Sequence, residues 1–89
     1  MTTVRTVRIT NKRGLHARAS AKFVTLASSQ SAQVEVEKDG SKVAGTSIMG
    51  LMMLGAAMGD SVTISASGDG AIQAVDALCG LVENKFGEE

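Results

Sequence analysis

The dipeptide Asp39-Gly40 constrains the fold of this chain more than any other local feature, because it separates two short segments of strand-like sequence. Residues 33–37 alternate polar and apolar side chains, and residues 41–44 follow directly after the dipeptide. Asp-Gly favours the two-residue turns that join neighbouring antiparallel strands. The sequence therefore predicts a β-hairpin, and any sheet built on it contains an antiparallel pair.

The rest of the chain predicts two further strands and three helices. Alternation rich in β-branched residues indicates strands over 4–10 and 62–66, and helical spacing indicates helices over 17–29, 47–54 and 71–85. Gly55 is expected to end the middle helix, and Asp69 is an N-cap candidate for the last one. The order β-α-β-β-α-β-α predicts an α+β fold in which helices cover one face of one sheet. Without a repeat or a Pro-rich linker, residues 1–89 are expected to form a single domain.

Two of the predicted helices carry apolar faces that indicate how the core is built. With 89 residues, the core is expected to be close to the lower limit for independent stability. In the first helix the predicted apolar face comprises Ala21, Phe23, Val24, Leu26 and Ala27. The last helix has a stripe comprising Ile72, Val75, Leu78, Cys79, Val82 and Phe86. Cys79 is the single cysteine, so an intramolecular disulfide is excluded and a buried core thiol is expected.

Composition excludes several classes of partner and chemistry. Nine basic residues balance nine acidic ones and only two residues are aromatic, which argues against nucleic acid as a partner. The uncharged segment 43–59 is shorter than the ~20 residues of a spanning helix and is interrupted by glycines, so neither membrane insertion nor a signal peptide is expected. One histidine and one cysteine predict no metal site, and the Gly45–Gly50 pair lacks the lysine of a nucleotide cradle, so no cofactor is expected. A cytoplasmic location fits this composition.

The only histidine, His16, lies where a loop is expected to become the first helix, within Gly14-Leu15-His16-Ala17-Arg18. A helix N-terminus exposes unpaired N–H groups and about half a positive charge, which favour an anion attached to His16 and disfavour the imidazolium form. The guanidinium of Arg18 suits phosphate oxygens. His16 is therefore a candidate phosphate carrier, although a lone histidine in a small protein is most often a solvated surface residue.

A second segment, Ser47-Ile48-Met49-Gly50, follows at a distance along the chain that strengthens this hypothesis. Together the two motifs resemble those of HPr, the histidine-containing phosphocarrier family of the bacterial phosphoenolpyruvate-dependent phosphotransferase system. The first motif is similar to the family's active-site sequence and the second to its regulatory-serine sequence. One departure is Ala19, where the family usually has proline; alanine is a good helix former, so less rigid geometry but no loss of function is expected.

The resemblance implies an open-faced β-sandwich with antiparallel strand order 1-4-2-3. It also implies that the protein is a phosphoryl carrier and not an enzyme. His16 would accept a phosphoryl group through Nδ1 from phospho-enzyme I and pass it to acceptors of the enzyme IIA type. Arg18 and the backbone amides of Ala17 and Ala19 would hold the phosphoryl oxygens.

Ser47 has two interpretations that are compatible with each other. Serine is a favoured N-cap, and the resemblance implies that a dedicated HPr kinase/phosphorylase could modify it. Core packing accounts for Leu51, Leu54 and Met53, whereas Met49 and Met52 are expected to form an outward patch that docks unrelated partners. The predicted docking positions are Met49, Met52, Leu51, Gly55 and Ser20, and a monomer is expected; Ser20 could touch the histidine or face solvent.

Two alternative functions remain open at this point. In one, the chain is a regulatory protein of the nitrogen-related branch of the same system, whose phosphorylation state is a signal and which moves no sugar. In the other, it is an interaction module in which His16 carries no phosphoryl group. The motifs do not separate sugar transport from regulation, because that difference depends on which acceptor proteins accompany the chain.

Overall fold

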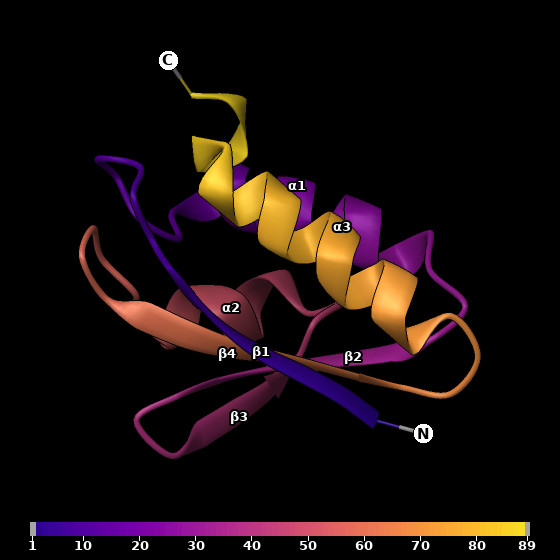
Figure 1. The fold of residues 1–89 in the computed structure, drawn as a ribbon. Coiled ribbons are helices and arrows are strands. Elements are labelled where there is room, and N and C mark those ends of the chain that lie inside the picture. Colours follow the sequence, from indigo (N-terminus) through magenta and orange to yellow (C-terminus); the bar gives the residue numbers. More distant parts are fainter. Residues whose placement is uncertain (1, 89) are drawn as a thin grey trace.

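A computed structural model describes residues 2–88 and has a four-stranded sheet with helices stacked on it (Figure 1). The strands are β1 (Thr2–Arg8), β2 (Gln33–Lys38), β3 (Ser41–Ala44) and β4 (Ser61–Ser67). The helices are α1 (Ala17–Ser28), α2 (Ile48–Met53) and α3 (Ala71–Glu83), and a short 3₁₀ turn covers Lys85–Gly87. This order confirms the predicted β-α-β-β-α-β-α arrangement.

The sheet is antiparallel throughout, with strand order β1-β4-β2-β3. The predicted hairpin joins β2 to β3, and both turn residues have positive φ, 52° at Asp39 and 86° at Gly40. In the registers, Val7 faces Val62 and Val36 faces Ile64, so the buried side chains of three strands meet on one face of the sheet. The open-faced sandwich with strand order 1-4-2-3 is therefore confirmed.

The core lies between that face of the sheet and the helices. Figure 1 shows α1 and α3 running across the sheet together, and α2 packs against α1 and β3. The largest fully buried side chains include Phe23, Leu51, Ile64, Leu78 and Phe86. Cys79 is buried among them as a free thiol, as expected, and burial raises its pKa.

Most elements begin and end within one residue of the predicted bounds, but the first strand, the end of the last helix and one cap differ more. The first strand is Thr2–Arg8 and not residues 4–10, because β4 extends to Ser67 and pairs with Thr2, while Ile9 bonds instead to the loop residues Gly59 and Asp60. The last helix ends at Glu83 and not at residue 85. The prediction that Asp69 caps α3 was wrong: Gly70, with φ of 79°, occupies the N-cap position and provides no side-chain cap.

Several predicted core positions are also wrong, and helical geometry explains each of them. Ile72 is 53% exposed because Ala71, Ala74 and Val75 occupy the inward positions of the first turns of α3. Met53 is 80% exposed, since it lies two positions from Leu51 and so faces away from the direction shared by Leu51 and Leu54. In α1 the buried residues are Ala19, Ser20, Phe23 and Ala27. Val24 and Leu26 are half-buried and pack against the core as predicted, whereas Ala21 is half-buried and is not among the residues that do so.

Candidate functional site

The loop between β1 and α1 places His16 at the start of α1. Gly14 adopts a φ of 64° and packs against backbone: a Cβ there would lie 2.4 Å from the carbonyl oxygen of Ala56. Leu15 buries its side chain and donates its N–H to the same carbonyl, at 2.9 Å. These contacts attach the loop to the segment that follows α2, so the position of His16 depends on both.

His16 is itself the N-cap of α1. Its backbone is extended, its carbonyl accepts from Ser20 N at 2.9 Å, and its Nδ1 accepts from Arg18 N at 3.2 Å. A side chain that accepts from the second helical amide satisfies one of the donors left free at a helix start. The backbone N–H groups of Ala17 and Ala19 have no partner within the helix, because the first hydrogen bond of α1 is donated by Ser20 N. The structure thus brings together the residues predicted to hold phosphoryl oxygens.

The other ring nitrogen of His16, Nε2, is hydrogen-bonded to a carboxylate oxygen of Glu88. The two side chains are largely shielded, with 14% of the His16 side chain and 19% of the Glu88 side chain exposed. The hydrogen bond from His16 lowers the pKa of Glu88, and a second one from the buried Asn11, whose Nδ2 lies 3.1 Å from Oε1, acts in the same direction. Glu88 is therefore ionised at neutral pH.

These two contacts define which nitrogen of His16 carries the proton. An ionised carboxylate only accepts hydrogen bonds, and a backbone N–H only donates them. Nε2, which meets Glu88, must carry the proton, and Nδ1, which meets Arg18 N–H, must present its lone pair. The uncharged ring therefore has its nucleophilic nitrogen at the helix N-terminus.

The C-terminal segment holds Glu88 in this position. Phe86 is 1% exposed, and Lys22 donates from Nζ to its carbonyl oxygen at 2.7 Å. Asn11 donates from Nδ2 to Gly14 O, at 2.8 Å, as well as to Glu88, and so links this segment to the β1–α1 loop. Neither Asn11 nor Glu88 was among the site residues predicted from the sequence. No local sequence pattern could indicate a role for Glu88, because it lies 72 positions from His16.

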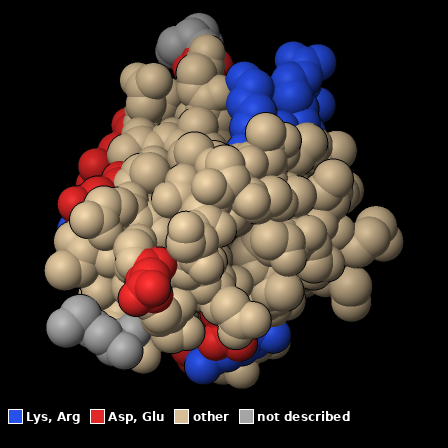
Figure 2. Space-filling view, turned by 90° about the vertical axis from the view of Figure 1, so that its right-hand side faces the viewer, with Lys and Arg blue, Asp and Glu red and all other residues tan. Residues whose placement is uncertain are grey.

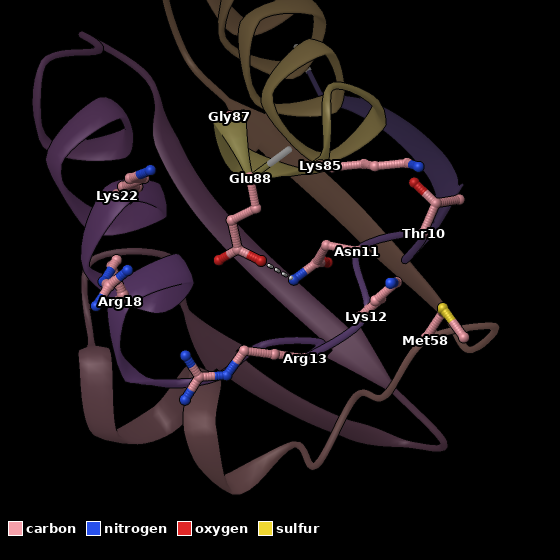
Figure 3. A pocket seen from close by; sticks show the side chains of 10 residues that line it. All are labelled: Thr10, Asn11, Lys12, Arg13, Arg18, Lys22, Met58, Lys85, Gly87 and Glu88. Carbon is pink, nitrogen blue, oxygen red and sulfur yellow. Dashed lines mark hydrogen bonds between the residues drawn. The ribbon is translucent and has the colours of Figure 1, made fainter.

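A basic pocket of about 490 Å³ adjoins this arrangement. Figure 3 shows its lining side chains, with Glu88 pointing between Asn11 and α1. Five of the ten lining residues are cations: Lys12, Arg13, Arg18, Lys22 and Lys85. The face in Figure 2 is mostly uncharged, and its largest group of Lys and Arg side chains lies at the top, the end at which Figure 1 shows the C-terminal segment. The site is suited to an anionic group or an acidic partner.

Two of the predicted docking residues are buried, so those predictions were wrong. Ser20 is fully buried: its Oγ donates to Leu15 O at 3.2 Å and its backbone N–H donates to His16 O, so it contacts the backbone of the histidine and does not face solvent. Ser20 thereby supports Leu15, the residue that precedes His16. Leu51 is fully buried too, because it lies on the inward side of α2 and packs into the core.

The other predicted docking residues lie at the surface. Met49 is 68% exposed, Met52 is exposed as well, and Gly55 follows α2 with a φ of 65°. We define the methionine patch as the exposed apolar side chains Ile48, Met49, Met52, Met53 and Met58. Met58 also lines the basic pocket together with Arg18. Through Met58, the methionine patch reaches the cations that line this pocket.

Ser47 is the N-cap of α2, as predicted, and its Oγ accepts from Gly50 N at 3.0 Å. Its side chain is partly accessible. In the part of the chain that the structure describes, no helix is long and apolar enough to cross a membrane. Residues 2–88 also contain no group of three or more His, Cys, Asp or Glu side chains placed to hold a metal ion.

The fold and this site define a class of small α+β proteins that present a histidine at a helix N-terminus. A family profile described as "PTS HPr component phosphorylation site" matches residues 3–84. The chain belongs to the HPr family of phosphocarriers of the phosphotransferase system. This family is named for carrying a phosphoryl group and not for catalysing a reaction of its own.

Both HPr and NPr phosphocarriers are similar to this chain in sequence. It is 49% identical to the phosphocarrier protein HPr of Cupriavidus necator over 90% of each chain. It is 43% identical to the phosphocarrier protein NPr of Shewanella violacea, over 94% of this chain and 92% of the other. Among solved structures, HPr from Thermoanaerobacter tengcongensis is 52% identical, covers 98% of each chain and gives a TM-score of 0.93. A structure described as a dimer of HPr from that organism gives a TM-score of 0.78, with 92% of this chain and 94% of the other covered.

Proposed function

We propose that this protein carries phosphoryl groups on Nδ1 of His16, accepting them from phospho-enzyme I and passing them to proteins of the enzyme IIA type. The observation that carries the proposal is the orientation of His16, whose Nδ1 lone pair lies at the start of α1 while Nε2 is held by Glu88. A single domain comprising residues 1–89, working in the cytoplasm as a monomer, is proposed to perform this role.

The proposed step is an in-line displacement at phosphorus. The Nδ1 lone pair of His16 forms the new N–P bond, and the bond to the donor's leaving atom breaks and returns its electron pair to the donor. The amide of Arg18 loses its bond to Nδ1 in this step, so it becomes free to donate to a phosphoryl oxygen. The amides of Ala17 and Ala19 and the Arg18 guanidinium provide further donors, and positioning and charge stabilisation account for most of such a transfer.

The surface around His16 supports docking to protein partners. Cations around the pocket attract acidic surfaces, and the methionine patch next to them offers flexible apolar contacts that adapt to partners of different shape. Met49, Met52 and Gly55 are the proposed docking positions on this patch. An enzyme I surface and an enzyme IIA surface would use the same area in turn, because both must reach His16.

Intact-mass spectrometry tests the carrier function. The protein is incubated with enzyme I, Mg²⁺ and phosphoenolpyruvate and is kept at alkaline pH, because phosphohistidine is acid-labile. One added phosphoryl group that requires both enzyme I and phosphoenolpyruvate is expected. If a known HPr is labelled in parallel and this protein is not, the interaction module without phosphoryl transfer becomes the better hypothesis.

A second candidate function is the regulatory, nitrogen-related branch, and the similarity to an NPr protein favours it. The chemistry at His16 is the same in both branches, so the acceptor decides between them. The phosphorylated protein is offered a sugar-type and a nitrogen-type enzyme IIA in separate reactions with equal concentrations. Faster transfer to the sugar type supports sugar transport, and faster transfer to the nitrogen type supports regulation.

Ser47 is proposed to be both a helix cap and a substrate of an HPr kinase/phosphorylase. Replacing Ser47 by alanine removes the bond to Gly50 N and is expected to lower the free energy of unfolding by about 1 kcal/mol. Urea denaturation measures this change, and Ser47→Asn, which retains a capping oxygen, is expected to stay close to the wild type. The kinase should label the wild type but neither variant. Equal labelling of Ser47→Ala and the wild type would contradict the regulatory assignment.

A further inference from the structure

We propose that Glu88 is a positioning residue that keeps Nε2 of His16 protonated before and after phosphoryl transfer, so that the phosphoryl group is passed on from an imidazolium ring. This inference rests on the proposed function of His16 and deepens it. It assigns a role to a residue at the far end of the chain.

The Glu88 carboxylate is held in place through both of its oxygens. One of its oxygens meets Nε2 of His16, and Nδ2 of Asn11 donates to the other at 3.1 Å. Asn11 is itself 1% exposed and is fixed by its bond to Gly14 O. Both oxygens are thus oriented by partly or fully buried donors, unlike those of a surface carboxylate that samples many positions.

The chain adopts an unfavourable backbone conformation at the residues that lead to Glu88. Lys85 and Phe86 both have a φ of 56°, in the left-handed region that residues with a side chain rarely adopt. Burial of the Phe86 side chain and the bond from Lys22 to its carbonyl offset the cost of that conformation. The segment after α3 therefore turns back over the site and does not continue the helix.

The charges near the His16 ring are mostly positive. The side chains that line the adjoining pocket include the cations Lys12, Arg13, Arg18, Lys22 and Lys85, and all of them oppose a positive imidazolium. Glu88 is the carboxylate of that lining, and it lies directly on Nε2. A single well-placed negative charge therefore determines whether the ring keeps its Nε2 proton once Nδ1 carries the phosphoryl group.

The negative charge of Glu88 matters because the ring becomes positively charged while it carries the phosphoryl group. When Nδ1 of His16 forms its bond to phosphorus, the ring still bears the Nε2 proton and becomes a positively charged phosphoimidazolium. Glu88 neutralises that charge, so the proton stays. On transfer to the acceptor, the N–P bond breaks, its electron pair returns to Nδ1, and the neutral ring with its Nε2 proton is restored. No proton has to enter or leave in either step.

Without the carboxylate, the phosphorylated ring loses its Nε2 proton more readily. The phosphoryl group is then attached to a neutral imidazole, and the leaving group on cleavage is the less stable imidazolate. Cleavage of the N–P bond slows for that reason. A carboxylate bonded to a catalytic histidine acts in the same way in other proteins: it fixes the tautomer of the ring and stabilises its cationic form.

The experiment compares Glu88→Gln, which preserves shape but removes the charge, with Glu83→Gln, an exposed position on α3 outside the pocket. Each protein is phosphorylated with phosphoramidate, a small donor that needs no protein partner, and ³¹P NMR identifies the nitrogen that is modified. At mildly alkaline pH, phospho-Glu88→Gln is expected to survive about tenfold longer than the wild type or Glu83→Gln. At mildly acidic pH the three half-lives should converge, because every ring is then protonated.

The outcomes separate this inference from the proposed function. Equal half-lives and equal pH profiles for Glu88→Gln and the wild type overturn the role of Glu88, as does phosphorylation of the wild type at Nε2. Failure of enzyme I to label the wild type overturns the proposed relay but leaves the comparison with phosphoramidate valid. In the unlabelled protein, NMR titration of the Glu88 carboxyl gives an independent test: its pKa should lie below the ordinary value and rise in His16→Asn. An ordinary pKa in the wild type contradicts the contact on which the inference is built.

Discussion

Replacing His16 by asparagine is expected to abolish phosphorylation by enzyme I while the fold is retained. Asparagine is among the best N-cap residues, so its side-chain oxygen can accept the Arg18 amide that Nδ1 accepts in the wild type. It offers no nucleophilic ring nitrogen, so the expected loss is complete within detection, corresponding to more than about a thousandfold in rate. Intact-mass spectrometry at alkaline pH measures the label.

His16→Ala serves as the companion variant. It removes both the nucleophile and the cap, so it should also lose the label and be about 1 kcal/mol less stable than His16→Asn. Circular dichroism and urea denaturation show whether both variants remain folded. One phosphoryl group on either folded variant, in the presence of enzyme I and phosphoenolpyruvate, would mean that another residue is the acceptor.

Replacing Gly14 by alanine is expected to damage stability and phosphorylation together. The added Cβ would lie 2.4 Å from Ala56 O and 2.9 Å from Ala57 Cα, and both obstacles are backbone atoms that cannot rotate away. Steric overpacking costs about 1–3 kcal/mol, and the positive φ of 64° adds roughly 1–2 kcal/mol for a residue with a side chain. Against a total stability of about 5–15 kcal/mol, this loss is large.

The shift needed to relieve that clash also moves the active histidine. Leu15 N donates to Ala56 O, so displacement of the loop breaks the contact that precedes His16. A displacement of about 1 Å can slow a positioned transfer about a hundredfold, and we expect phosphorylation by enzyme I to slow by that order. Urea denaturation and the initial rate of labelling measure the two effects.

Gly40→Ala is the matched control for this prediction. Gly40 also has a positive φ, 86°, but a Cβ there meets nothing within 4 Å and the turn lies at the hairpin tip. Only the conformational cost of roughly 1–2 kcal/mol is expected, with an unchanged rate of phosphorylation. Equal effects of the two substitutions would show that strain, and not the contact with Ala56, determines the consequences at Gly14.

Local sequence patterns were sufficient to predict most of the helices, strands and turns and their order. Asp39-Gly40 formed the predicted turn because a two-residue hairpin depends on the conformations of its own two residues. Ser47 capped α2 for a similar reason, since a cap bonds to an amide three positions away. Three of the predictions that failed, at Ile72, Met53 and Ser20, concern the direction in which a helix faces the sheet. Apolar spacing alone leaves that direction uncertain by one position when apolar residues surround the helix.

The amino-acid sequence was enough to predict the element order, the hairpin and the position of His16 at a helix start, because each depends on residues a few positions apart. The surroundings of the His16 ring, in contrast, form only when distant parts of the chain pack together. Glu88 lies 72 positions away and reaches Nε2 because Phe86 is buried in a core built from the whole chain. The basic pocket likewise combines residues from the β1–α1 loop, α1 and the C-terminal segment. Contacts over such separations arise from packing of the folded chain, and no local periodicity encodes them.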